Sequence, residues 1–217
     1  MLFDIAQLQA SYGASATANG GVTNAEGTRI WTFADNAHPF MEGMDTASPY
    51  RNPGRVLVTL WTPSGLQDIL DATNLNTKAL IDLRPGEFSA IGTQDATDAP
   101  IDRGKLNVGI AFNAVLERAI GGSKSDDIRG NHVANVLEGN AGDDVLDGGT
   151  HEITASGRGA GDGVADTLVG GDGADVFVLR NGSGLDVVND TGPTDRLDFR
   201  DASDIRVPFQ GVGVRQT

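Results

Sequence analysis

Short apolar segments recur along the chain between stretches rich in Gly, Pro, Asn and Asp. Segments of this kind, bounded by turn residues, are typical of the strands of an all-β protein. The clearest of them are residues 30–33, 55–61, 81–83 and 106–112. Residues 2–12 differ, because their apolar side chains return at helical spacing and Gly13 follows as a stop. We therefore expect one short N-terminal helix and, after it, strands and turns.

From Gly121 onward a nine-residue pattern repeats, in the form Gly-Gly-x-Gly-x-Asp-x-U-x, where U is a large apolar residue. The pattern fills residues 121–129 (GGSKSDDIR), 130–138 (GNHVANVLE), 139–147 (GNAGDDVLD) and 170–178 (GGDGADVFV). The apolar position holds Ile128, Leu137, Leu146, Leu168 and Phe177, and the acidic position holds Asp126, Asn135, Asp144, Asp166 and Asp175. A disordered linker has no reason to keep the apolar position, so the repeat predicts a folded unit.

Each repeat combines a turn of six glycine-rich residues with a three-residue strand whose apolar side chain points inward. Two repeats make one coil of a parallel solenoid, so the acids of repeats two apart face each other. Two such charges about 4 Å apart repel by about 4 kcal/mol at an effective dielectric near 20. Calcium would reverse this repulsion, because it binds carboxylates together with backbone carbonyls, whereas magnesium fits less well. The predicted calcium ligands are therefore the five residues of the acidic position and, in the turns, Gly122, Gly142, Gly171 and Gly173.

The repeat is interrupted between Gly148 and Val169, and this segment has two interpretations. In the one that we favour, a single repeat carries thirteen extra residues in its turn, which stacks Asp126 on Asp144, Asn135 on Asp166, and Asp144 on Asp175. In the other, a degenerate repeat is followed by another, and Asp144 stacks on Asp166. Two departures weaken the pattern: Asn135 lacks a charge, and Lys124 stands where Gly is usual, in a turn conformation that lysine disfavours.

Composition supports oxygen-ligand metal sites and excludes several other classes of protein. Asp accounts for 24 of the 30 acids and Gly for 30 of 217 residues, which favours turns over acidic helices. A net charge of −14 makes nucleic acid a poor partner. The absence of Cys excludes disulfides, iron–sulfur clusters and thiol catalysis. No apolar run reaches the roughly 20 residues of a membrane span, and residues 1–6 do not resemble a cleaved secretory signal.

The repeats resemble those of RTX proteins, and three further segments resemble the C-terminal part of serralysin-type zinc metalloproteases. These segments are DIAQLQASYGA at 4–14, IDLRPGEFSAIG at 81–92 and NAVLERAIGG at 113–122. The similarity spans most of residues 2–200 and implies an all-β fold, in which a parallel β-roll is joined to a β-sandwich-like region. It divides the chain into the end of a protease-domain helix (1–15), a β-rich region (16–118), the β-roll (119–180, with an inserted loop at 150–163) and terminal strands or an edge (181–217).

The family also binds calcium near a Trp-Asp-x-Gly-Gly-x-Asp segment, which corresponds here to residues 61–68. This chain departs from it, because Thr62 replaces the Asp and the stretch is one residue longer. Asp68 and Asp71 remain as candidate ligands, and the alternative is that they are solvated turn acids. The DRLDF run at 195–199 resembles the strand after the family's β-roll, with acids that either close a calcium site or line a solvated edge.

The zinc motif H-E-x-x-H-x-x-G-x-x-H of serralysins is missing. The chain has only His38, His132 and His151, and the segment HEITA at 151–155 has Ala155 where the second His must be. No G-x-S-x-G motif is present either. We therefore expect no zinc and no catalytic activity in this chain as given.

The resemblance implies a calcium-binding module of a secreted protein. Such a module stays unfolded where calcium is scarce, passes through a type I secretion channel without an N-terminal signal peptide, and folds outside the cell, which supports secretion and stability. One alternative is the non-catalytic tail of an active zinc metalloprotease whose catalytic domain lies upstream. Another is a polysaccharide-binding or adhesion module.

Overall fold

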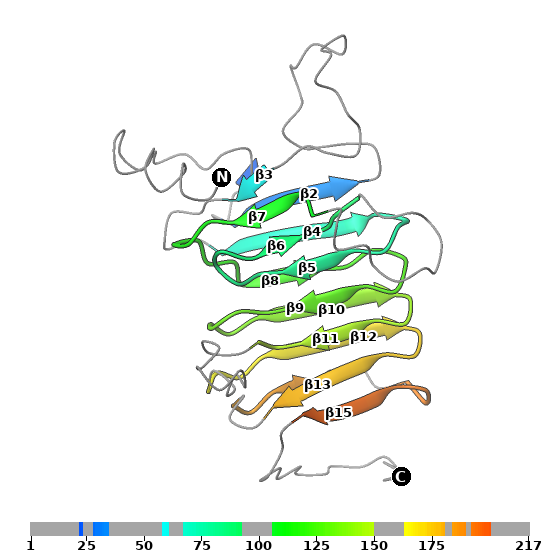
Figure 1. Ribbon diagram of the computed structural model, residues 1–217. Coiled ribbons are helices and arrows are strands. Elements are labelled where there is room, and N and C mark those ends of the chain that lie inside the picture. The colour runs from blue at the N-terminus through cyan, green and yellow to red at the C-terminus, as the bar shows by residue number, and fades with distance from the viewer. Residues whose placement is uncertain are drawn as a thin grey trace, which may run out of the picture.

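The computed structural model describes residues 22–23, 28–34, 58–60, 67–92, 106–149, 163–180, 184–189 and 192–200. Within these residues the chain is all-β, and its strands stack from β2 at one end to β15 at the other (Figure 1). No helix in the described segments is long and apolar enough to cross a membrane. The helix predicted over residues 2–12 lies outside the described residues.

Two large sheets form the roll. The first contains, in order, β1 (Val22–Thr23), β2 (Arg29–Ala34), β4 (Asp68–Asn74), β8 (Arg118–Ile120), β10 (Val136–Ala141), β12 (Thr167–Asp172) and β14 (Val187–Val188). The second contains β15 (Arg196–Arg200), β13 (Val176–Arg180), β11 (Val145–Asp147), β9 (Asp127–Arg129) and β5 (Leu80–Asp82). Neighbouring strands are parallel throughout, except for the antiparallel pair β1 and β2.

A third, smaller sheet consists of β3 (Val58–Leu60), β7 (Val108–Ile110) and β6 (Phe88–Ser89). Strand β7 is parallel to β3 and antiparallel to β6. Phe88 lies opposite Gly109, and its ring covers the face that a side chain at Gly109 would occupy. The aromatic ring thus replaces packing that the glycine cannot supply.

From β8 onward the chain alternates between the two large sheets, so each pair of consecutive strands is one coil of the roll. The predicted inward positions are all fully buried between the sheets: Ile128, Leu137, Leu146, Leu168 and Phe177. The nine-residue period therefore specified the strands and the core of the roll correctly.

The strands before the repeats belong to the same two sheets. Strand β4 pairs with β8, and β5 pairs with β9, both in parallel. The region predicted to resemble a β-sandwich therefore has two facing sheets, as expected. Both sheets continue into the roll across residue 119. The domain boundaries at 16, 119 and 181 stay predictions.

The register across the interrupted repeat follows the interpretation that we favoured. Strand β10 pairs Val136 with Arg118, eighteen residues before it, and with Thr167, thirty-one residues after it. The thirteen additional residues thus leave the ladder in phase, and the alternative register is wrong.

Backbone conformation explains why some turn positions require glycine. Gly171 (φ 101°) and Gly173 (φ 149°) have positive φ, and a Cβ atom at either would overlap a carbonyl oxygen of the neighbouring coil. Asn140 (φ 73°) is the one non-glycine with positive φ in the described part of the chain. The strain expected at Lys124 is therefore absent, because its turn follows an ordinary backbone path.

Candidate metal centre

The acids that precede the strands of the second sheet form one column along the roll. Column 1 consists of Asp126, Asp144, Asp175 and Asp195. In each step, the backbone N–H of one acid donates to Oδ1 of the acid one coil further on. The N···O distances are 2.6 Å from Asp126 to Asp144, 2.9 Å from Asp144 to Asp175 and 3.0 Å from Asp175 to Asp195.

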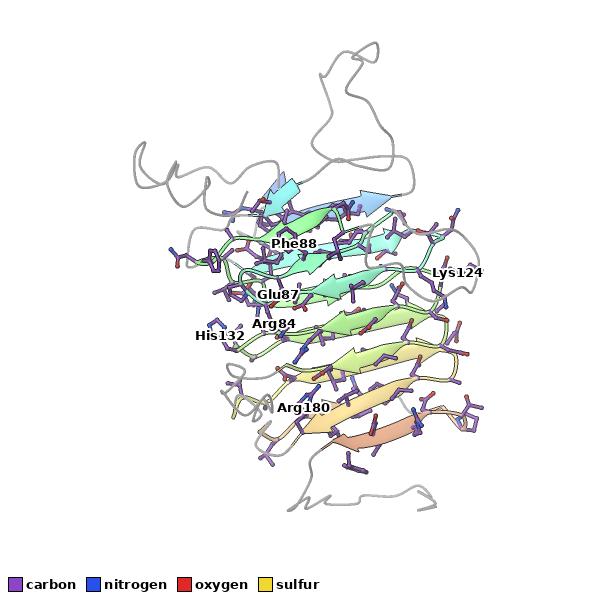
Figure 2. All side chains as sticks on the ribbon, in the orientation of Figure 1. Arg84, Glu87, Phe88, Lys124, His132 and Arg180 are labelled. Atoms are coloured by element: carbon purple, nitrogen blue, oxygen red, sulfur yellow. The ribbon has the colours of Figure 1, made fainter. Side chains whose placement is uncertain are left out.

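A second column precedes the strands of the first sheet. Column 2 consists of Asp68, Glu117, Asn135, Asp166 and Asp186. Its N–H groups donate in the same direction, from Asp68 to Oε2 of Glu117 (2.7 Å), from Asn135 to Oδ1 of Asp166 (2.8 Å) and from Asp166 to Oδ1 of Asp186 (3.1 Å). The two columns follow opposite edges of the roll. Figure 2 shows these edges by two labelled residues, Lys124 in a turn of column 1 and His132 in a turn of column 2.

Sequence reasoning predicted the stacking of Asp126 on Asp144, Asn135 on Asp166, and Asp144 on Asp175, and these contacts are present. It did not place Glu117, Asp186 or Asp195 in a column, although it considered that acids of the DRLDF run, which includes Asp195, close a calcium site. Each of these acids lies two residues before an inward-facing apolar residue, which is the signal that could have identified it. For Asp186 and Asp195 the signal was obscured because the last coil advances by twenty residues, as from Asp166 to Asp186, in place of eighteen, whereas Glu117 precedes the first nine-residue unit.

Within column 1, Asp144 is fully buried, and its two carboxylate oxygens have different surroundings. Oδ1 accepts the N–H of Asp126, whereas the buried Oδ2 accepts no hydrogen bond. Oδ2 of Asp166 and Oδ2 of Asp175 also accept none, although the other atoms of these two residues have partners. A buried carboxylate oxygen left in this state is costly unless a cation or a proton neutralises it.

The open oxygens face the first glycine of their own turn. A Cβ atom at Gly139 would overlap Oδ2 of Asp144 and lie 2.6 Å from the carbonyl oxygen of Gly170. In this turn a carboxylate oxygen and a main-chain carbonyl oxygen therefore lie beside the same small space. The space is open because residue 139 is glycine and has no side chain. A Cβ atom at Gly148 or Gly170 would likewise overlap Oδ2 of Asp166 or Asp175, respectively.

Burial dominates the electrostatics of column 1. Loss of solvent, with a smaller contribution from the neighbouring charges of Asp126 and Asp175, raises the pKa of Asp144 to about 8, although the N–H of Asp126 opposes the shift. Burial likewise raises the pKa of Asp126 to about 7, although N–H groups of Gly122 and Ala79 oppose the shift. These carboxyl groups therefore hold protons near neutral pH unless a cation takes the proton's place.

The donor set fits a hard cation. Among the residues that the structure describes, no three His, Asp or Glu side chains converge as they would in a cage built from side chains alone. The turn at Gly139 instead combines a carboxylate oxygen with a main-chain carbonyl oxygen, and donors of these two kinds are the ones that calcium uses. Asp144, Asp166 and Asp175 would supply the charge at these sites, whereas both carboxylate oxygens of Asp126 accept backbone N–H groups, so its role as a ligand stays a prediction.

The glycines predicted as ligands have different roles in the turns. The N–H of Gly122 donates to Oδ2 of Asp126 over 2.6 Å. Gly142 (φ 127°), like Gly171 and Gly173, has positive φ and packs against the backbone of an adjacent coil. These contacts explain why the three positions require glycine, while the coordination of calcium by the carbonyls of Gly122, Gly142, Gly171 and Gly173 stays a prediction.

The structure does not bring Asp68 and Asp71 together. Both lie in β4, three residues apart and hence on opposite faces of the strand. Asp68 is 1% exposed and forms an ion pair with Arg29, with 3.1 Å between Nη1 and Oδ1. Asp71 accepts the N–H of Thr73 over 3.0 Å. The interpretation of Asp68 as a solvated turn acid is therefore wrong, because its carboxylate is buried and paired.

Of the histidines considered for zinc, His132 is exposed in the turn before β10. His38, His151 and the HEITA segment lie outside the described residues.

Comparison with known proteins gives consistent matches. A family model described as "Peptidase M10 serralysin C terminal" matches residues 25–205. Serralysin of Proteus mirabilis is 33% identical over 137 residues, which are 63% of this chain and 23% of that protein. Metallopeptidase AprA of Pseudomonas marginalis is 30% identical over 138 residues, 64% of this chain and 24% of that protein. The chain thus spans about a quarter of the length of these relatives.

Proposed function

Because the chain belongs to the peptidase M10 serralysin C-terminal family, we propose that it is a calcium-binding RTX module that folds when calcium binds outside the cell. In this role it supports the secretion and the stability of a serralysin-like metalloprotease. The relatives named serralysin and metallopeptidase, of which the chain matches about a quarter, support a parent protein with an upstream protease domain.

The buried Oδ2 of Asp144 carries this proposal. It accepts no hydrogen bond, and its pKa is raised by burial and by the adjacent acids. A calcium ion in the turn would supply the missing partner and cancel the repulsion along column 1. Oδ2 of Asp166 and Oδ2 of Asp175 face the first glycine of their own turns in the same way, so several ions are expected rather than one.

Ligand linkage gives the scale of the effect. Calcium at about 100 times a site's dissociation constant stabilises the folded state by about 2.7 kcal/mol per site. A few such sites match the whole stability of an ordinary domain, about 5–15 kcal/mol. Calcium concentration can therefore decide between an unfolded chain, which suits passage through a type I secretion channel, and a folded one outside the cell.

Circular dichroism of the 217-residue chain in calcium and in EDTA tests the proposal. We expect a β-sheet spectrum in calcium, partial loss of it in EDTA, and recovery on addition of calcium in excess. Isothermal titration calorimetry under the same conditions gives the number of ions bound. An identical spectrum in both buffers, with no heat of calcium binding, would contradict the proposal.

Adhesion to polysaccharide has less support from the described surface. Two of its exposed aromatic residues, Phe88 and Phe112, cover Gly109 and Gly86, which accounts for them structurally.

A further inference from the structure

The two ends of the roll differ in how their buried oxygens are satisfied. We infer that the N-terminal coils, from β2 to β9, close without metal and form a folded template on which calcium adds the coils from β11 to β15. This inference rests on the proposed function, because it divides the roll into a part that calcium must stabilise and a part that it need not. Three groups of contacts and the distribution of the core support it.

The first contact lies at the head of column 2, where the chain provides its own cation. Arg29 pairs with Asp68 in the register of β2 and β4, and both side chains are buried, at 3% and 1% exposure. Nη1 of Arg29 lies 3.1 Å from Oδ1 of Asp68, and the guanidinium carbon lies 5.5 Å from the centroid of the Trp31 ring. A fixed positive charge thus neutralises the first carboxylate of the column without a metal ion.

The second group of contacts lies in the turn between β9 and β10. Nδ2 of Asn131 and Nδ2 of Asn135 both donate to the carbonyl oxygen of Leu116, over 2.8 and 3.0 Å. The orientation of each amide is fixed, because Oδ1 of Asn131 accepts the N–H of Val133 and Oδ1 of Asn135 accepts the N–H of Asn131. In this turn, side-chain N–H donors therefore occupy a main-chain oxygen of the kind that a cation would bind.

The third contact marks the boundary in column 1. Both carboxylate oxygens of Asp126 accept backbone N–H groups, Oδ1 from Ala79 and Oδ2 from Gly122, each over 2.6 Å. One coil later, Asp144 has only its Oδ1 satisfied in this way. The need for an external cation thus begins between β9 and β11.

The hydrophobic core is distributed in the same way. Among the described residues, the N-terminal part contains most of the largest fully buried side chains: Trp31, Leu60, Leu70, Leu75, Ile81, Leu83, Ile91, Ile110 and Leu116. The later strands mainly supply one central buried apolar residue each, such as Leu146 in β11 and Leu168 in β12. Apolar burial stabilises by about 25 cal/mol per Å², so the N-terminal coils have a driving force for folding that does not depend on metal.

Hydrogen exchange of the 217-residue chain, read by mass spectrometry in calcium and in EDTA, tests the inference. We expect β2, β4, β5 and β8 to stay protected in both buffers, and β11 to β15 to be protected only in calcium. Loss of protection from β2 to β8 in EDTA would overturn the inference while leaving the proposed function intact. Equal protection of every strand in both buffers would instead contradict the proposed function.

Two substitutions test the origin of the template. Arg29→Gln removes the internal cation and should accelerate exchange of β2 and β4 in EDTA by at least tenfold. Arg118→Gln is the matched control, because it removes an arginine that pairs with Glu138 on the outer face of the same sheet and is 39% exposed. That control should leave exchange of β2 and β4 unchanged.

Asn135→Asp provides a second test that does not depend on Arg29. It replaces an N–H donor to Leu116 with a carboxylate, so exchange of β8 and β10 should accelerate in EDTA and return to slow exchange in calcium. If neither Arg29→Gln nor Asn135→Asp alters protection in EDTA, the internal donors are not what closes the N-terminal coils, and the inference fails.

Discussion

At the scale of single residues, each buried acid of column 1 serves two neighbours. Oδ1 of Asp144 joins its coil to the preceding one through the N–H of Asp126, while Oδ2 faces the interior of its own turn. The first contact is a hydrogen bond that every coil needs for stacking. The second oxygen links stability to metal, because burial without a partner destabilises the charged form.

Replacing Asp144 should therefore have opposite effects with and without calcium. We expect Asp144→Asn to lower the number of bound calcium ions and the melting temperature in calcium, because a charged ligand is lost. In EDTA the same variant should melt at a higher temperature than the original chain, because a buried charge is removed. Calorimetry and thermal melts check both signs, with Asp172→Asn, an exposed acid outside the columns, as control. A lower melting temperature in both buffers would show that Asp144 acts only through packing.

The raised pKa values predict how calcium binding depends on pH. The pKa rises from 3.8 to about 7 for Asp126 and to about 8 for Asp144, so the metal-free folded turns hold protons that the unfolded chain releases. The free energy of unfolding of the metal-free fold should thus decrease as the pH rises from about 4 to about 8. Calcium that binds a folded, metal-free turn must displace its proton, whereas a turn that folds only with calcium releases none. The half-saturating concentration should therefore fall by up to about tenfold per pH unit for each proton released.

Calcium titrations followed by circular dichroism at pH 6, 7 and 8 check this dependence. A half-saturating concentration that does not change over this range would show that the column carboxyls are already ionised without metal.

The sequence was informative about residues wherever the repeat kept its length. Asp126, Asp144 and Asp175 were identified because each lies two residues before an apolar position in a nine-residue unit. Asp195 was left between a closing calcium site and a solvated edge, because a coil of different length precedes it. Asp68 was misread because its partner, Arg29, is 39 residues away in sequence, and only the parallel pairing of β2 and β4 brings them together.

At the scale of elements, the turns set how closely the coils approach. Gly171 has a positive φ, and a Cβ atom there would also overlap the carbonyl oxygen of Asn140 in the coil before. Gly163 has a positive φ as well, but a Cβ atom there would meet nothing within 4 Å. Alanine substitutions at Gly163 and Gly171 therefore separate two contributions to the free energy of unfolding, the strain of the backbone conformation and the close stacking of the coils.

Gly163→Ala should destabilise the calcium-loaded chain by about 1–2 kcal/mol, the ordinary cost of a left-handed conformation for an L-residue. Gly171→Ala should cost clearly more, because β10 and β12 must also move apart. Urea unfolding at saturating calcium measures both values. Equal losses for the two variants would mean that close stacking of the coils contributes nothing beyond backbone strain.

Sequence patterns predicted the strands of the repeats better than those before them. The nine-residue period fixed both the strand positions and the inward side chains. Before residue 118, apolar segments indicated β2, β3, β5 and β7 but not β4, and nothing local showed that β4 would pair with β8, or β5 with β9. Pairing between strands of high sequence separation depends on packing across the whole roll, which a local pattern does not record.

At the scale of the whole molecule, a net charge of −14 opposes compaction, and this repulsion is concentrated where the acids stack. Dissolved salt screens the repulsion between exposed charges, but it screens the repulsion between buried carboxylates much less. The chain as a whole should therefore respond to the identity of the cation and not only to ionic strength.

Melting temperature should thus increase with the logarithm of calcium concentration. Magnesium at equal concentration should give a much smaller increase, because it requires a tighter octahedral set of ligands than these turns offer. Sodium chloride at matched ionic strength is the control. Equal stabilisation by calcium, magnesium and sodium would assign the effect to general screening and not to bound ions.

The pairing of Val136 with Thr167 has a consequence for how such molecules can change over evolution. A coil of thirty-one residues stacks in register beside one of eighteen. The additional residues between β11 and β12 therefore do not shift the pairing of the neighbouring strands. Closing a longer loop costs only about 0.6 kcal/mol for each doubling of its length. Homologues can therefore gain or lose peptide at this corner freely, and an epitope or a reporter peptide grafted there should leave the rest of the architecture undisturbed.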